Sequence, residues 1–92
     1  MYVTEHAAQR MWERFNTNSN KIQGMITNSN EVFDVIDRKL SYDLSMDLGR
    51  RKIVVGRSPR AYFVIDHRNN VVTVLTEAQA MNNLKVGKWT KL

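Results

Sequence analysis

The hydrophobic periodicity of the chain changes near Arg51, and this change constrains the fold more than any other feature. The segments KIVVG, AYFVID and VVTVLT alternate with a period of two and are rich in β-branched and aromatic residues, which is typical of β-strands. The turn formers RSPR and HRNN separate them, and asparagine suits the positive φ of tight turns. The pattern predicts an antiparallel β-meander.

The register of this meander assigns its side chains to two faces of different character. A two-residue or a four-residue loop at HRNN gives the same parity, so one face is predicted to be wholly apolar and to receive the helices. Its residues are Ala61, Phe63, Ile65, Val72 and Val74. The other face is mixed, and an antiparallel sheet can leave such a face as a binding surface. Its residues are Tyr62, Val64, Asp66, Val71, Thr73 and Leu75.

The stretch VTEHAAQRMWERF predicts an amphipathic helix before the meander. Thr4 is suited to cap this helix, and Glu5 is favourable in its first turn. Four apolar side chains follow helical spacing and are predicted to anchor the helix on the sheet: Ala8, Met11, Trp12 and Phe15. A polar row at four-residue spacing lies roughly opposite that stripe: His6, Arg10 and Arg14.

The rest of the chain completes an α+β domain. The Asn/Ser-rich stretches NTNSN and TNSN indicate helix boundaries, with two short helices after the first. The segment EVFDVID also alternates like a strand, so Glu31–Leu40 is left open between helix and strand. Thr76 and Gln79 form a capping box for a short C-terminal helix, and Trp89 is predicted to pack back on the domain. The prediction is a single domain (1–92) with N-terminal helices on one face of a small antiparallel meander.

The charge distribution favours an anionic partner. The net charge is +5, from 14 Lys and Arg against 9 Asp and Glu, which favours a nucleic acid, an acidic protein or an anionic membrane. The segment GRRKIVVGRSPR carries five cations and no acid. With Tyr62, which could stack on a base, these are the predicted nucleic-acid-binding residues: Arg50, Arg51, Lys52, Arg57 and Arg60.

Composition excludes several classes of site. The chain has no cysteine, which excludes disulfides, thiol nucleophiles and Cys-based metal sites and fits a cytoplasmic location. No apolar run approaches the roughly 18–20 residues that span a membrane, so no membrane association is predicted. Two histidines make a transition-metal site improbable, and the aspartates at 34, 37, 43 and 47 fit no EF-hand spacing. Neither a cofactor nor a metal is predicted.

The row on the first helix is the best candidate for chemistry. The guanidinium groups of Arg10 and Arg14 could neutralise phosphate oxygens, and the imidazole of His6 could transfer a proton near neutral pH. Metal-independent RNA cleavage needs such a set of groups. The competing interpretation is the ordinary solvated face of a surface helix. Thr73, a polar residue within an apolar strand, is a supporting candidate, although threonine is also common in strands.

Two sequence motifs resemble a known group of proteins. The segment HAAQRMWER (residues 6–14) fits an early H-A-x-x-R-x-x-x-R signature, and the closing strand is VVTVL (residues 71–75). These resemble small toxin-like domains of the barnase–EndoU–colicin–RelE type. The resemblance implies helices followed by a sheet, and metal-independent RNA cleavage or RNA binding. It implies that His6 and Arg10 form the acid–base and phosphate-binding pair, with Arg14 and Thr73 in support.

Two functional hypotheses follow, and the position of His6 in the fold distinguishes them. The first is a small RNA-cleaving or RNA-binding domain of the toxin type, with RNA as partner and a protein partner, such as an antidote or host target, as a second possibility. The alternative is a non-catalytic phage or mobile-element protein that binds and inhibits a host protein or nucleic-acid complex. A cleft that places His6 within reach of Arg10, Thr73 or Arg60 favours catalysis, whereas an imidazole that points to open solvent with no convergent polar partner favours binding. The sequence makes no prediction of oligomeric state.

Overall fold

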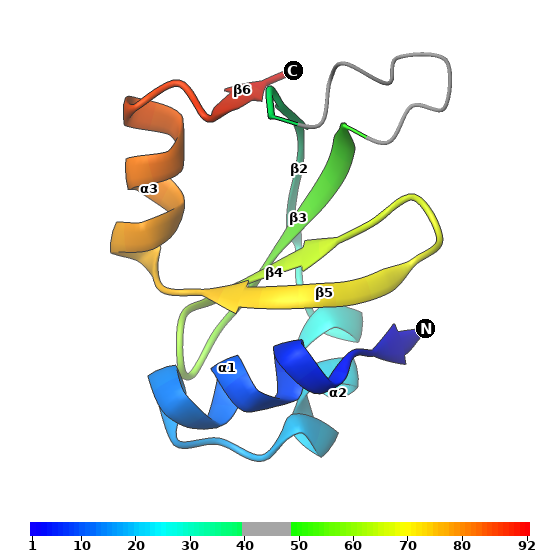
Figure 1. Cartoon of the computed structure of the whole chain (residues 1–92). Helices are drawn as coiled ribbons and strands as arrows, with labels where there is room; N and C mark the ends of the chain where they lie inside the picture. Colours follow the sequence, from blue (N-terminus) through cyan, green and yellow to red (C-terminus); the bar gives the residue numbers. More distant parts are fainter. Residues whose placement is uncertain (40–48) are drawn as a thin grey trace.

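The computed structural model describes residues 1–39 and 49–92 of the chain. Within these residues, six strands form one mixed sheet in the order β1-β5-β4-β3-β2-β6 (Figure 1). The strands are β1 (Tyr2–Val3), β2 (Glu31–Asp37), β3 (Arg50–Gly56), β4 (Ala61–Ile65), β5 (Asn70–Leu75) and β6 (Trp89–Lys91). The helices are α1 (Glu5–Phe15), α2 (Ile22–Thr27) and α3 (Glu77–Lys85), with a 3₁₀ turn at Ser19–Lys21.

The centre of the sheet is the predicted meander, extended at both edges. Strands β2, β3, β4 and β5 pair antiparallel in chain order, which confirms an α+β fold built on a meander. The short strand β1 adds to β5 in parallel, and β6 adds to the second half of β2. The sheet is therefore mixed and wider than the sequence pattern predicted.

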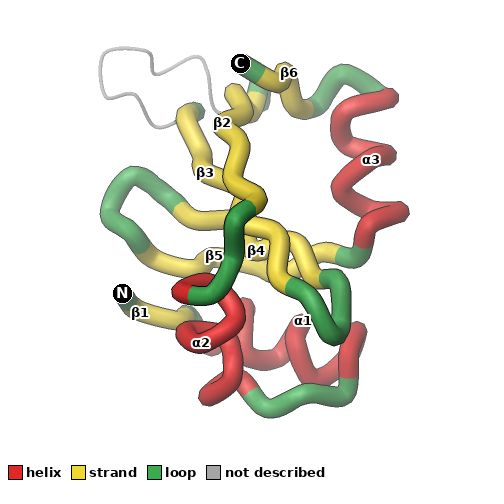
Figure 2. The backbone as a smooth tube through the Cα atoms, turned by 180° about the vertical axis from the view of Figure 1, so that it is seen from behind, coloured by secondary structure: helices red, strands yellow, loops and turns green. Residues whose placement is uncertain are grey.

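Helices lie on both faces of the sheet. Figures 1 and 2 show α1 and α2 together on one side of the β4–β5 pair and α3 on the other. The core on the α1 side includes Met11, Ile22, Phe63 and Val74, and the core on the α3 side includes Val35, Ile53, Val64 and Trp89. The predicted burial of Trp89 is confirmed, at 5% exposure.

The segment EVFDVID is a strand, so the second of the two short helices predicted after the first is wrong. Residues Glu31–Asp37 form β2, which pairs along its length with β3; Leu40, at the end of the open range, lies outside the described residues. The apolar spacing there is compatible with a helix and a strand alike. Backbone pairing with β3 on one side and β6 on the other favours the strand, because a central strand satisfies its backbone groups through both neighbours.

Helix α1 is rotated about its axis relative to the predicted orientation. Ala7 and Met11 are fully buried, whereas Trp12, expected in the core, is 60% exposed. The N-terminus of the helix is fixed by Thr4, whose backbone amide donates to the Val71 carbonyl oxygen at 3.1 Å. Because Ala7 is small, the helix can approach β5 closely on that side. The rotation brings the Arg14 side of the helix toward the sheet.

A β-bulge reverses the predicted faces of two valines. The pairing of β5 with β4 joins Thr73 to Val64 but Val71 to Ile65, so Val72 is the additional residue. A bulge of this kind breaks the strict two-residue alternation. Val71 consequently packs in the core beside α1, and Val72 packs against the core on the α3 side, which is the opposite of the predicted assignment.

Local helix signals are confirmed where they were predicted. The Thr4 hydroxyl accepts from the Ala7 amide at 3.1 Å and caps α1. Thr76 and Gln79 form the expected capping box at the start of α3. No helix in the described part of the chain is long and apolar enough to cross a membrane.

Candidate functional site

A depression of about 430 Å³ lies on the face of the sheet that packs against α3. Its floor comes from β4 and β5, one wall from α1, and the other from α3 and the segment that leads into β6. The floor residues are Val64, Val72, Thr73 and Leu75, and the α1 residues are His6, Arg10 and Arg14. The remaining lining comes from Asp37, Arg51, Asn83, Lys88 and Trp89.

The site therefore unites all four residues that the sequence singled out for chemistry. Positions four apart lie on one helical face, and the rotation of α1 carries this face around the β5 edge. Thr73 reaches the same place because the bulge precedes it and preserves its pairing with Val64. No described residue hydrogen-bonds the imidazole of His6 or the hydroxyl of Thr73, so both groups are available to a ligand.

The two arginines of the row are held differently. Arg14 is partly buried and donates from Nη1 to the Val74 carbonyl oxygen at 2.6 Å. Arg10 donates from Nη1 to Glu13 Oε2, also at 2.6 Å. The bond to Val74 fixes Arg14 to the sheet, whereas the bond of Arg10 to an exposed carboxylate can be exchanged for another anion.

The electrostatics of the row favour a bound anion. Partial burial lowers the pKa of the Arg14 guanidinium, and the positive charge of Arg10 lowers this pKa further. Hydrogen bonds from Gln9 and Arg10 lower the pKa of the Glu13 carboxyl below its ordinary value. Two adjacent cations repel one another, so a phosphate placed between them would relieve an unfavourable interaction.

The sequence reasoning did not place Asp37 and Arg51 in this site. Asp37 is buried, with 7% exposure, and its Oδ1 accepts from the Lys39 amide at 3.0 Å. Its Oδ2 lies 4.0 Å from Arg51 Nε, which is too long for a hydrogen bond. The sequence does offer one indication of Asp37. It lies two residues after Val35, so in a strand it shares the buried face of Val35. Asn83 and Lys88 had no comparable signal.

The fold divides the basic run between separate surfaces. Alternation along β3 sends Arg51 to the depression beside α1, with Arg50 and Lys52 on the other face. Arg57 lies at the far end of β3, where it lines a different depression beside α2. The five cations predicted to bind nucleic acid therefore do not form one patch.

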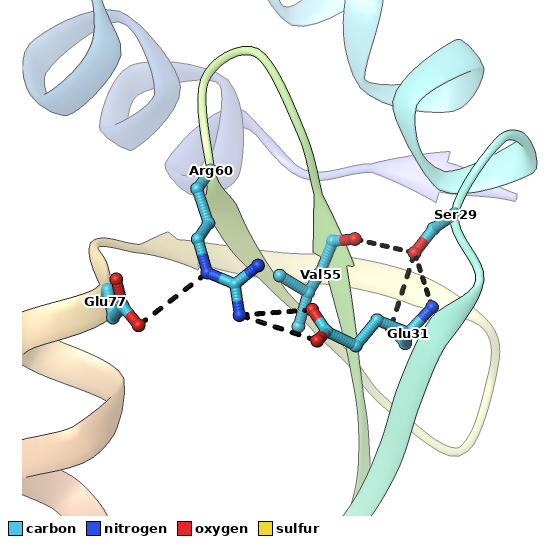
Figure 3. Close-up of polar contacts among 5 residues, drawn as sticks. All are labelled: Ser29, Glu31, Val55, Arg60 and Glu77. Atoms are coloured by element: carbon cyan, nitrogen blue, oxygen red, sulfur yellow. Dashed lines mark hydrogen bonds and ion pairs between the residues drawn. The ribbon is translucent and has the colours of Figure 1, made fainter.

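Arg60 and Tyr62 belong to a third surface, away from His6. Arg60 Nη2 lies 3.2 Å from Glu31 Oε2, and Arg60 Nε lies 3.7 Å from Glu77 Oε1 (Figure 3). The guanidinium is 5.5 Å from the centre of the Tyr62 ring, which is buried. In the same view, the Ser29 hydroxyl donates to the Val55 carbonyl oxygen at 2.6 Å and ties the start of β2 to β3.

Metal ligands do not converge in the described residues: no group of three His, Asp or Glu side chains is placed to hold an ion. Asp43 and Asp47 lie outside the described residues. His67 is in the β4–β5 turn and does not line the depression that contains His6.

Comparison with known proteins adds no relative: the chain matches no protein-family model, no curated protein and no solved structure. The resemblance of the HAAQRMWER helix to toxin-like domains therefore stays a prediction. What the site can do follows from its own groups, which are several cations, one imidazole, one hydroxyl and an apolar floor. Such a set can bind a phosphodiester and move a proton.

Proposed function

We propose that this protein binds RNA in the depression beside α1 and cleaves it without a metal ion. One observation carries the proposal: His6, Arg10, Arg14 and Thr73 line the same depression, together with Arg51. A row on the solvated face of an ordinary helix would not converge with residues of two strands. The apolar floor, which includes Val64 and Leu75, can receive a base whose phosphate faces the cations.

The proposed reaction is an internal transesterification of RNA. The imidazole of His6 accepts the proton of the ribose 2′-hydroxyl, and the 2′-oxygen attacks the adjacent phosphorus. Arg10 and Arg14 stabilise the added negative charge on the phosphate oxygens. The bond from phosphorus to the 5′-oxygen breaks, and water gives this oxygen a proton. The products are a 2′,3′-cyclic phosphate and a 5′-hydroxyl end.

The test is cleavage of end-labelled single-stranded RNA by the purified protein in excess EDTA. We expect cyclic phosphate ends, and no product when the 2′-hydroxyls are replaced by hydrogen. His6→Ala should lower the cleavage rate by roughly 10²–10⁴, the usual contribution of a proton-transfer group. The affinity for RNA should change by less than about threefold. His67→Ala is the matched control for cleavage of short RNA, because His67 lies outside the depression. Equal rates for both variants would contradict the proposal.

Binding without cleavage is the second candidate function. It is favoured by the isolation of His6, since the base of a catalytic pair is commonly oriented by a hydrogen bond from a third group and no described residue supplies one. In that case the wild type binds RNA with a salt-dependent affinity but leaves it intact. The cleavage assay and a binding assay on the same RNA separate the two functions.

A further inference from the structure

A second depression, of about 440 Å³, lies at the other side of Arg51. Its lining comes from β2, β3 and the β4–β5 turn: Asp34, Arg50, Arg51, Lys52, Asp66, His67 and Asn69. Arg51 lines this depression and also the one that contains His6. The two hollows are therefore adjacent, and Arg51 is the residue that they share.

Arg51 can line both depressions because β3 and β4 separate next to it. Their pairing ends at Lys52 and Ile65, so Arg51 lies just beyond the last pair. Figure 1 shows the start of β3 and the β4–β5 turn diverging from this point. Because the pairing of β3 with β4 has ended there, Arg51 is not flanked by β4 and can line a depression on each side.

The turn that borders the second depression is built rigidly. Asp66 Oδ1 accepts from the backbone amides of Arg68 and Asn70, both at 2.9 Å. Asn69 has a positive φ of 63°, a conformation that asparagine tolerates better than most residues. These contacts fix the backbone that presents His67 and Asn69.

The charges of the second depression suit a phosphate chain. Lys52 and Arg51 supply positive charge, and the Asp66 carboxylate, which stays negative, accepts hydrogen bonds from the two turn amides and offsets part of it. Asp34 is exposed and lies opposite Lys52 in the β2–β3 register, so it offsets part of that charge. His67 and Asn69 are exposed and can stack on a base or hydrogen-bond to its edge.

We propose that one single strand of RNA spans both depressions, with Arg51 contacting the phosphate between them. This inference rests on the proposed function and adds a second binding site for the nucleotides beside the cleaved bond. Each depression has the size of a site for one small molecule, roughly 300–1,000 Å³. A single strand is required because its unstacked bases can enter such hollows, whereas a duplex keeps its bases paired inside.

The experiment compares a dinucleotide with a hexanucleotide, both 2′-O-methylated so that they cannot be cleaved. Affinity is measured by fluorescence anisotropy for the wild type, Lys52→Ala, and the double variant His67→Ala with Asn69→Gly, since glycine keeps the positive φ. In the variants, we expect the hexanucleotide to bind about tenfold more weakly and the dinucleotide less than about twofold more weakly. The slope of log affinity against log salt concentration should be lower by about 0.7 for each phosphate contact that is lost. Arg10→Ala should weaken both ligands, and Lys85→Ala, an exposed lysine of α3, should weaken neither.

Three outcomes would overturn the inference. The first is that the variants weaken both ligands equally, the second that they leave the hexanucleotide unaffected, and the third that the wild type binds an RNA duplex as tightly as the single strand. In each of these cases the proposed function survives, provided that the dinucleotide still binds and Arg10→Ala still weakens it. If the wild type binds neither ligand, the proposed function itself fails and the inference falls with it. Thermal unfolding of each variant checks that it is folded.

Discussion

Arg10 and Arg14 occupy the same helix face, yet their partners give them different roles. Arg14 is bonded to a backbone carbonyl of β5, so its position depends on the sheet. Arg10 forms an ion pair with Glu13, one turn along α1. A phosphate that bound Arg10 would have to displace this carboxylate. Glu13 would therefore compete with the proposed ligand for Arg10.

Glu13→Gln should strengthen RNA binding. An exposed ion pair contributes about 0–1 kcal/mol, so freeing Arg10 should lower the Kd up to about fivefold. The measurement is fluorescence anisotropy with a short, 2′-O-methylated RNA at fixed ionic strength. Glu5→Gln is the matched control, since it makes the same change in net charge at an exposed position on α1. An equal gain in both variants would attribute the effect to net charge alone.

Some residues of the candidate site can be identified from nearby sequence, whereas others are brought there only by the fold. His6, Arg10 and Arg14 could be selected because their spacing lies within one helix, and Thr73 because it interrupts an apolar strand. Asp37, Arg51 and Lys88 come from distant parts of the chain, and their convergence depends on strand pairing and on the separation of β3 from β4. No spacing in the sequence encodes that convergence.

At the level of elements, the contact between the β3–β4 hairpin and α2 depends on a glycine. A Cβ at Gly56 would lie 2.7 Å from Phe63 Cε2 and 3.0 Å from Met25 Cε. Phe63 is fully buried and cannot move aside, although Met25 is flexible. The close packing of α2 on β3 therefore requires the absence of a side chain at this position.

Gly56→Ala should destabilise the protein by about 1–3 kcal/mol, the usual cost of overpacking a core. Gly24→Ala is the control, because a Cβ at this helical position meets no atom within 4 Å. That change should stabilise the protein by about 0.5–1 kcal/mol through helix propensity. Both values come from urea unfolding monitored by circular dichroism. Destabilisation by both substitutions would contradict the packing argument.

The β4–β5 turn should make stability depend on pH. Burial raises the pKa of the Asp66 carboxyl, but hydrogen bonds from the Asn70 and Arg68 amides lower it more, so it lies below the ordinary 3.8. The folded state thus binds this proton less tightly than the unfolded state does. The stabilisation is complete above the ordinary value and is lost as the pH falls through the folded-state pKa.

Asp66→Asn should therefore cost stability at neutral pH and much less in acid. Loss of the charged acceptor should lower the unfolding free energy by about 1 kcal/mol at pH 7, and the difference from wild type should shrink below the ordinary pKa. Urea unfolding at several pH values gives the comparison, and Asp34→Asn is a control for removal of one nearby carboxylate. A difference that stays constant with pH would exclude this role of the charge.

Elements with local signals were predictable, and those fixed by distant partners were not. The caps at Thr4 and Thr76 lie within a few residues of the groups they bind, so the sequence reveals them. The strand at EVFDVID is selected by pairing with β3 and β6, and the rotation of α1 by contacts with β5. The bulge at Val72 depends on how β5 meets β4, which alternation alone does not reveal.

For the molecule as a whole, the candidate site lies where two separately packed layers meet. The core beside α1 and the core beside α3 share the sheet between them, and the depression is bounded by residues from both sides. Neither half contains the complete lining. We infer that the depression forms only when both layers are packed, so the proposed RNA binding would report on the integrity of the entire fold.

Removing Arg14 should affect how molecules associate with one another. β1 covers the outer edge of β5 only at Asn70 and Val71, and beyond it Arg14 occupies the carbonyl oxygen of Val74. Arg14→Ala should lower the unfolding free energy by about 1–2 kcal/mol and, unlike Arg10→Ala, should produce concentration-dependent association in sedimentation velocity. Monomeric behaviour of both variants at high concentration would show that the edge is protected by other means.

The bond from Arg14 to Val74 thus links protection of the sheet edge to the geometry of the candidate site. An uncovered strand edge is a template for pairing with another chain, and here the cover is a side chain that also lines the candidate site. A change that retuned the site at this position would also expose the protein to aggregation. Variation in ligand preference is therefore easier at Arg10, which has no part in shielding the sheet, than at Arg14.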